Sequence, residues 1–152
     1  VMGPSSLPAY YAQAHETLDP AQTVLETIRL GGNMSESNAV AFAAKFLFTY
    51  RQTAQKVSEL SGGERSRLQL ALIMLSRANF LLLDEPTNNL DIASAEVLED
   101  ALAEFEGTAL IISHDRYFLD QVVDRVLVLD GGGVVSHPGG YSDILSGSPK
   151  NN

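Results

Sequence analysis

Two adjacent carboxylates, Asp84 and Glu85, directly follow the short apolar run 80–83. If that run is a strand of a parallel sheet, they lie at its carboxyl end, where ligands of open α/β folds bind. An aspartate there can hold Mg²⁺ directly or through water. Glu85 can then act as general base on a water that attacks phosphorus. An acid-rich turn without function is the alternative, and the pair alone does not separate the two interpretations.

A second candidate site is Ser61-Gly62-Gly63-Glu64, which precedes a helical stretch. Ser-x-x-Glu before an apolar helix is a capping box, and a capping box requires no ligand. The two glycines add room for a ligand to approach the free backbone N–H groups, and such a helix start favours phosphate. Both interpretations are compatible, and we favour their coexistence.

Histidine gives a weaker signal. His114 follows the apolar run 109–112, where a lone histidine is usually a structural hydrogen-bonding group. His15 and His137 lie in polar loops. The chain has no cysteine and no spaced His/Asp cluster, so we expect neither a zinc site nor disulfides.

The elements that position these residues begin with helices. A strand is expected over 7–11, with Gln13 just beyond it. Asp19-Pro20 predicts a helix start and Gly31-Gly32 its end. Further helices are expected after Ser35, with Val40, Ala43, Ala44 and Leu47 near one stripe, and from Ser61 through Arg77, with a polar connector over 51–58 between them.

The pattern then changes to short runs that are apolar at every position, at 80–83, 109–112 and 126–129. Such runs fit strands buried on both faces of a parallel sheet. An amphipathic helix that includes 96–106 and a helix over about 115–124 separate them, and Gly131–Gly133 turns the chain into a short return strand at 134–135. Alternating strands and helices predict an α/β fold.

Charge and composition narrow the function classes. The 152 residues carry 10 basic and 19 acidic side chains, and the whole net charge of −9 lies in residues 77–152. A field of that sign repels phosphate backbones, so direct nucleic-acid binding is not expected. The longest apolar run, 70–75, is too short for a membrane span. The first residues lack the features of a secretory signal, so a cytoplasmic location is expected.

Taken in order, the motifs resemble those of an ATP-binding cassette (ABC) ATPase. Leu60-Ser61-Gly62-Gly63-Glu64 resembles the signature motif, and 81–88 resembles the Walker B motif with the residues that follow it. Leu90-Asp91 resembles the D-loop, and Ser113-His114-Asp115 contains the switch histidine. The resemblance spans roughly residues 10–145. The stretches 85–91, 113–119 and 138–142 are most similar to the ABC-F branch, soluble tandem cassettes that act on ribosomes. Asn89 departs from that branch, which usually has histidine there.

The resemblance implies a P-loop NTPase fold of the ABC type. This is a three-layer α/β core with a mostly parallel sheet, here from residue 78 on, plus a helical signature subdomain over about 19–77. The cassette portion would be 1–145, with a mobile tail over 146–152. It also implies two ligands, ATP and Mg²⁺, and a second ABC cassette in a head-to-tail sandwich as partner, with the ribosome as a further partner of the intact protein.

The roles implied by the resemblance are specific. Gln13 would help to hold magnesium and the attacking water, and Asp84 would bind magnesium through water. Glu85 would be the catalytic base, and His114 would contact the γ-phosphate. Ser61, Gly62 and Gly63 would serve the nucleotide of the opposite cassette, with Ser61 and Gly63 reaching its γ-phosphate, and Asp91 would lie at that interface.

One motif of the family does not occur in the 152 residues: Gly-x-x-x-x-Gly-Lys-Ser/Thr, the P-loop. We therefore expect a fragment whose P-loop precedes Val1, and which alone binds ATP weakly and does not turn it over. The strand at 109–112 would then lack a neighbour on one edge, which favours self-association. An ATPase subunit of a membrane transporter and a non-catalytic module acting in trans are the alternative functions.

Overall fold

The computed structural model describes residues 6–11, 18–88 and 90–146. The chain divides into two compact units, Val1–Ile112 and Ser113–Asn152. Each unit is described by itself below.

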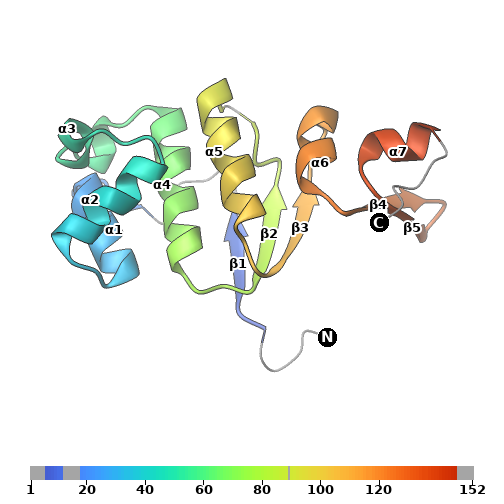
Figure 1. Cartoon of the computed structure of the whole chain (residues 1–152), viewed down its shortest axis with the longest axis horizontal. Helices are drawn as coiled ribbons and strands as arrows, with labels where there is room; N and C mark the ends of the chain where they lie inside the picture. Colours follow the sequence, from blue (N-terminus) through green and yellow to red (C-terminus); the bar gives the residue numbers. More distant parts are fainter. Residues whose placement is uncertain (1–5, 12–17, 89, 147–152) are drawn as a thin grey trace. The chain divides into compact units, whose positions relative to one another are not determined.

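The first unit is built on a parallel sheet of three strands in the order β1-β2-β3 (Figure 1). The strands are β1 (Pro8–Tyr11), β2 (Phe80–Asp84) and β3 (Thr108–Ile112). Tyr11 of β1 is level with Leu83 of β2, and Asp84 is level with Ile112 of β3. Three residues of these strands, Tyr11, Leu81 and Leu83, form a buried hydrophobic cluster. The predicted α/β class with a parallel sheet is therefore confirmed.

The unit also contains helices, of which α4 (Gly62–Leu75) contacts the sheet. They are α1 (Val24–Gly32), α2 (Glu36–Lys45), α3 (Tyr50–Thr53), the 3₁₀ turn η1 (Val57–Glu59), α4 (Gly62–Leu75) and α5 (Ile92–Ala103). Helix α4 packs against α1 and α5 and also contacts β1. Figure 1 shows α1, α2 and α3 on one side of α4 and the sheet on its other side. α4 therefore connects the helices α1 and α5 with the sheet.

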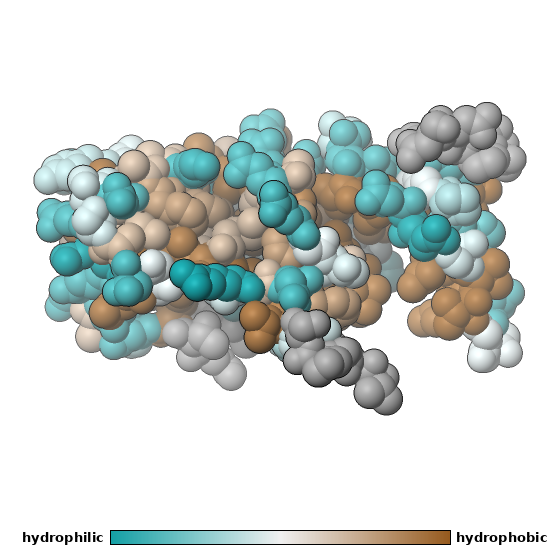
Figure 2. Space-filling model, turned by 60° about the horizontal axis from the view of Figure 1, so that its bottom comes forward, coloured by the Kyte–Doolittle hydropathy of each residue, from teal (hydrophilic) through white to brown (hydrophobic). Residues whose placement is uncertain are grey.

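The second unit consists of α6 (Arg116–Val122), β4 (Arg125–Asp130), β5 (Gly133–Pro138) and α7 (Tyr141–Ser146). β4 and β5 form an antiparallel hairpin, and its turn uses positive φ at Gly131 and Gly132. Helices α6 and α7 are joined by hydrogen bonds from Ser142 to Asp120. Figure 2 shows hydrophobic residues gathered on the surface of this hairpin. None of the helices in the described part of the chain has the length and apolar character needed to cross a bilayer.

Several predicted helix boundaries are wrong. Asp19 caps a turn by accepting from the Ala21 N–H, and α1 begins only after Thr23, which forms a capping box with Glu26. Two reciprocal hydrogen bonds stabilise that start better than the Asp-Pro pair. The helix does end at Gly32, as the Gly31-Gly32 pair predicted, and the left-handed residue that follows it is Asn33. The expected connector over 51–58 contains most of α3 and most of η1, and α3 starts at a further capping box formed by Thr49 and Gln52.

Burial also differs from the sequence pattern. Most side chains of β3 are exposed, although the run is apolar at every position. The run 126–129 is not in a parallel sheet, since β4 pairs antiparallel with β5. In α2 the buried face is Ala39 and Ala43, whereas Ala44 and Leu47 of the predicted stripe are exposed. A continuous apolar run does not by itself tell which neighbour will cover it.

Candidate functional site

The first part of the site is the start of α4. Ser61 is its N-cap: the Ser61 Oγ accepts from the Glu64 N–H at 3.2 Å, and Glu64 Oε2 accepts from the Ser61 N–H at 2.8 Å. Gln52 Nε2 also donates to Glu64 at 2.7 Å. Chiefly because of the Ser61 N–H, the pKa of the Glu64 carboxyl is lowered. The predicted capping box is therefore confirmed.

The glycines at this start leave it open. Among the described residues outside its own helix and chain neighbours, a Cβ at Gly62 would meet no atom within 4 Å, and a Cβ at Gly63 would lie 4.0 Å from Ser94 Oγ. Ser61 and Gly62 are exposed and Gly63 is half-buried. A ligand oxygen can therefore approach the N–H groups of this first turn without moving the protein, as a phosphate site at a helix start requires.

The second part is the pair of carboxylates that ends β2. Asp84 is the last residue of the strand, and the Glu85 N–H donates to the Ile112 carbonyl at 2.8 Å, which continues the pairing with β3. Glu85 has a φ of 47°, in the left-handed region that non-glycine residues rarely adopt. The following Pro86 is fully buried. The strand, its neighbour and the buried proline together hold this turn in place.

Magnesium fits this carboxylate pair. Among the described residues no group of three or more His, Cys, Asp or Glu side chains gathers to hold a metal. Mg²⁺ does not require one, because it takes one or two carboxylates and fills its other positions with water and substrate phosphate. Asp84, half-buried at the carboxyl end of the sheet, is such a partial donor set.

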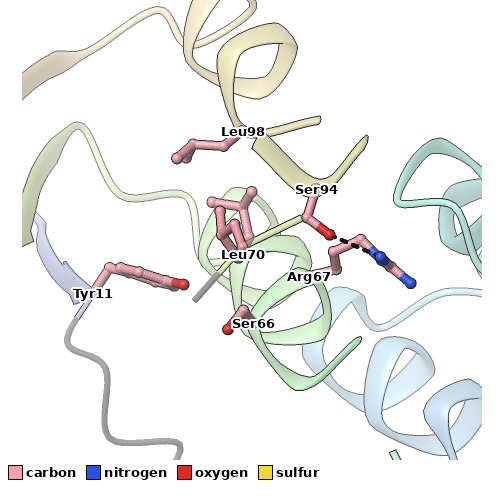
Figure 3. A pocket seen from close by; sticks show the side chains of 7 residues that line it. Tyr11, Ser66, Arg67, Leu70, Ser94 and Leu98 are labelled. Atoms are coloured by element: carbon pink, nitrogen blue, oxygen red, sulfur yellow. Dashed lines mark hydrogen bonds between the residues drawn. The ribbon is translucent and has the colours of Figure 1, made fainter. Parts of the chain in front are cut away.

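The third part is the start of α5. Asp91 is its N-cap, and Asp91 Oδ1 accepts from the Ser94 N–H at 2.8 Å. The pKa of Asp91 is lowered, first by its hydrogen bonds to Ser94 and also by the charge of Arg67. Arg67 Nη1 lies 3.8 Å from Asp91 Oδ2 and donates to Ser94 Oγ at 2.8 Å (Figure 3).

Sequence reasoning missed Arg67 and Ser94. The signal for Arg67 was weak: it lies three residues after Glu64 and directly before Leu68, in a helical stretch that also holds the polar residues Ser66 and Gln69. A cation at such a position requires a buried partner. Its partner Ser94 is 27 residues further along the chain, so the sequence does not identify it.

The predicted site residues fall into three groups. Ser61, Gly62, Gly63 and Asp91 belong to the facing starts of α4 and α5, and Asp84 and Glu85 to the end of β2. His114 is an exposed residue of the second unit, one position before Asp115, the N-cap of α6. Gln13 and Asn89 lie outside the described residues.

Comparison with known proteins finds a matching family and several relatives. Residues 6–88 match the family described as ABC transporter. The chain is 42% identical to the ATP-binding protein Uup of Caulobacter vibrioides over 93% of its length, and 39% identical to Uup of Escherichia coli over 89%. It is 41% identical to ABC transporter F family member 5 of Arabidopsis thaliana over 91%. The chain spans only 24%, 22% and 20% of these three relatives.

A solved structure shares the fold. The ATP-binding cassette MJ0796, determined as a dimer in a post-hydrolysis state with ADP and Pi, superposes with a TM-score of 0.68 at 24% identity. The match covers 88% of this chain and 63% of the other.

Proposed function

Because the chain belongs to the ABC transporter family of ATP-binding cassettes, we propose that it supplies the signature, Walker B and D-loop parts of an ATP-hydrolysing site. The observation that carries the proposal is the turn at Glu85. Its rare backbone conformation is held at the carboxyl end of a parallel sheet, beside a second carboxylate. Backbone strain of this kind concentrates at functional sites.

In this proposal Glu85 takes a proton from the attacking water. The water oxygen bonds to the γ-phosphorus of ATP, and the bond from that phosphorus to the bridging oxygen of ADP breaks. Asp84 would hold Mg²⁺ through water, and the ion would supply positive charge that offsets the charge of the phosphates. By the resemblance to the family, His114 would contact the γ-phosphate, and Gln13 would help to hold magnesium and the attacking water.

Ser61, Gly62 and Gly63 serve a nucleotide held by a second cassette, with Asp91 at the same interface. The first turn of α4 supports this assignment, because Ser61 and Gly62 are exposed and, among the described residues, a Cβ at Gly62 would meet nothing within 4 Å outside its own helix and chain neighbours. The dimeric state of the solved neighbour supports a second cassette as partner. The 152 residues contain no P-loop, so we expect Mg-ATP to bind this chain weakly, which isothermal titration measures.

From the resemblance to the ABC-F branch, and with ABC transporter F family member 5 among the relatives, we propose that the intact protein couples ATP hydrolysis to work on the ribosome. An ATPase subunit of a transporter and a module acting in trans are the alternatives. Sedimentation of the full-length gene product with purified ribosomes, with and without ATP, separates them: ATP-dependent co-sedimentation supports the ABC-F assignment, and its absence removes it.

The central test is Glu85→Gln in the full-length gene product. The amide keeps the shape of the side chain and removes the base, so hydrolysis should fall by about 10²-fold or more. ATP-driven association of the two cassettes should persist. Glu96→Gln on the exposed side of α5 is the matched control and should leave turnover unchanged. Wild-type turnover in Glu85→Gln would overturn the role of Glu85.

A further inference from the structure

Two neighbouring residues of α4, Ser66 and Arg67, are buried polar side chains that contact different elements. Ser66 is 7% exposed and Arg67 is 9% exposed. Figure 3 shows Arg67 beside Ser94 of α5 and Ser66 on the side of Tyr11 of β1. Leu70 and Leu98 line the same small pocket. α4 begins at the signature motif, so these contacts link that motif to other parts of the unit.

Arg67 makes the link to the D-loop. A buried guanidinium is costly unless it is paired and hydrogen-bonded. Its Nη1 donates to Ser94 Oγ at 2.8 Å and lies 3.8 Å from Asp91 Oδ2. The guanidinium carbon also lies 5.6 Å from the centre of the Phe48 ring, within cation–π range. Asp91 and Ser94 are the N-cap and third residue of α5, so Arg67 contacts the very start of that helix.

Ser66 makes a second link within the same turn. Its Oγ donates to the Gly62 carbonyl at 3.1 Å, which fixes it to the first turn of α4. Ser66 and Tyr11 line the same small pocket; burial raises the pKa of the Tyr11 hydroxyl, and Ser66 partly offsets that rise. Tyr11 ends β1, so the start of α4 is tied to the sheet as well as to α5.

We propose that Arg67 is a positioning residue that fixes the D-loop to the signature helix, so that the two move as one body. If α4 shifted without the start of α5, the hydrogen bond to Ser94 would break, and a guanidinium and a hydroxyl would stay buried without partners. A displacement of Ser61 and Gly63 by nucleotide is therefore passed on to Asp91. This inference rests on the proposed function for its catalytic consequence, but not for the mechanical coupling itself.

The coupling is tested on the 152-residue chain by amide hydrogen exchange. Arg67→Met keeps an unbranched apolar stem and removes the guanidinium. Exchange at 91–95 should become at least about tenfold faster, as expected for the loss of a buried charged hydrogen bond. In Arg67→Lys, which keeps a donor, the exchange rate at 91–95 should lie between those of the wild type and Arg67→Met. Unchanged exchange at 91–95 in Arg67→Met would overturn the proposal.

Arg65→Met is the matched control, because Arg65 lies two residues earlier on α4 and its Nη2 donates to the Ser58 carbonyl. It should leave exchange at 91–95 unchanged, and an equal rise in both variants would also overturn the proposal. If Arg67→Met fails to fold, Ser94→Ala provides the test. It removes the acceptor and keeps the Ser94 N–H that bonds Asp91.

The catalytic consequence is tested by the split between kcat and KM in the full-length gene product. Ser94→Ala and Arg67→Lys should lower kcat by roughly 10- to 100-fold, as expected for a misplaced catalytic group. The KM for ATP should change by less than twofold. The double variant should be no worse than the more severe single one, because both act through one contact. A raised KM with unchanged kcat, or additive losses, would contradict the role in positioning. Failure of Glu85→Gln to affect turnover would remove the proposed function while leaving the exchange result intact.

Discussion

Glu85 has a backbone conformation that favours glycine. Its φ of 47° costs a side chain with a Cβ roughly 1–2 kcal/mol. We therefore expect Glu85→Gly to be more stable than Glu85→Ala by about 1 kcal/mol, since both variants lose the carboxylate and differ only in the Cβ. Urea unfolding of the 152-residue chain measures the difference.

The control for this prediction is position 96, an exposed residue within α5. There the order should reverse, with Glu96→Ala more stable than Glu96→Gly by about 1 kcal/mol. An alanine preference at position 85 would mean that the turn relaxes out of the left-handed region and stores no strain.

The carboxyl group of Glu64 should make the stability of the folded chain depend on pH. Its pKa is lowered mainly by the hydrogen bond from the Ser61 N–H, so the folded chain binds this proton less readily than the unfolded chain. The resulting stability is present above the unfolded pKa and is lost as pH falls through the folded pKa. Between about pH 5 and pH 3 the wild-type chain should lose more stability than Glu64→Gln. Urea midpoints across this range measure the slope, and a Glu64→Gln slope equal to that of wild type would contradict the assignment.

At the scale of elements, the turn from α5 into β3 depends on a close approach at Gly107. A Cβ there would lie 2.6 Å from the Asn79 carbonyl oxygen and would overlap the Phe105 ring. The backbone cannot easily yield, because the Thr108 N–H donates to the same carbonyl at 3.0 Å. We expect Gly107→Ala to lower the free energy of unfolding by about 1–3 kcal/mol. Urea unfolding tests this, with Gly62→Ala as control, since in the described part of the chain a Cβ at Gly62 meets nothing within 4 Å outside its own helix and chain neighbours. Equal losses in both variants would show that space does not decide the effect.

At the scale of the whole molecule, the open edge of β3 predicts self-association. β3 pairs with β2, and no strand pairs with its other edge among the described residues. Leu110 is 41% exposed there, and an exposed apolar edge promotes pairing with another chain. Light scattering of the 152-residue chain should show a mass that rises with concentration, and Leu110→Lys should reduce it.

The control for this prediction is Leu145→Lys, the same substitution at an exposed leucine of α7. It should leave the association unchanged. A monomer at all concentrations, or an equal effect of both substitutions, would exclude the β3 edge as the contact.

The sequence by itself determined the features that depend on neighbouring residues. The capping box at Ser61 and Glu64 is local, because a side chain and an N–H three residues apart meet in any helix start. The apolar runs at 80–83 and 109–112 likewise predicted parallel strands, and the order of motifs predicted the family.

Only the tertiary structure decided the features that depend on distant partners. The side chains of β3 are mostly exposed, because exposure depends on which other elements pack against a strand. The apolar run itself does not predict those elements. The positive φ of Glu85 is enforced by β3 and the buried Pro86, since the local sequence would not choose it. Arg67 finds Ser94 because α4 and α5 pack together, across 27 residues of chain. Contacts at that separation are set by packing of whole elements, and no pattern within one element encodes them.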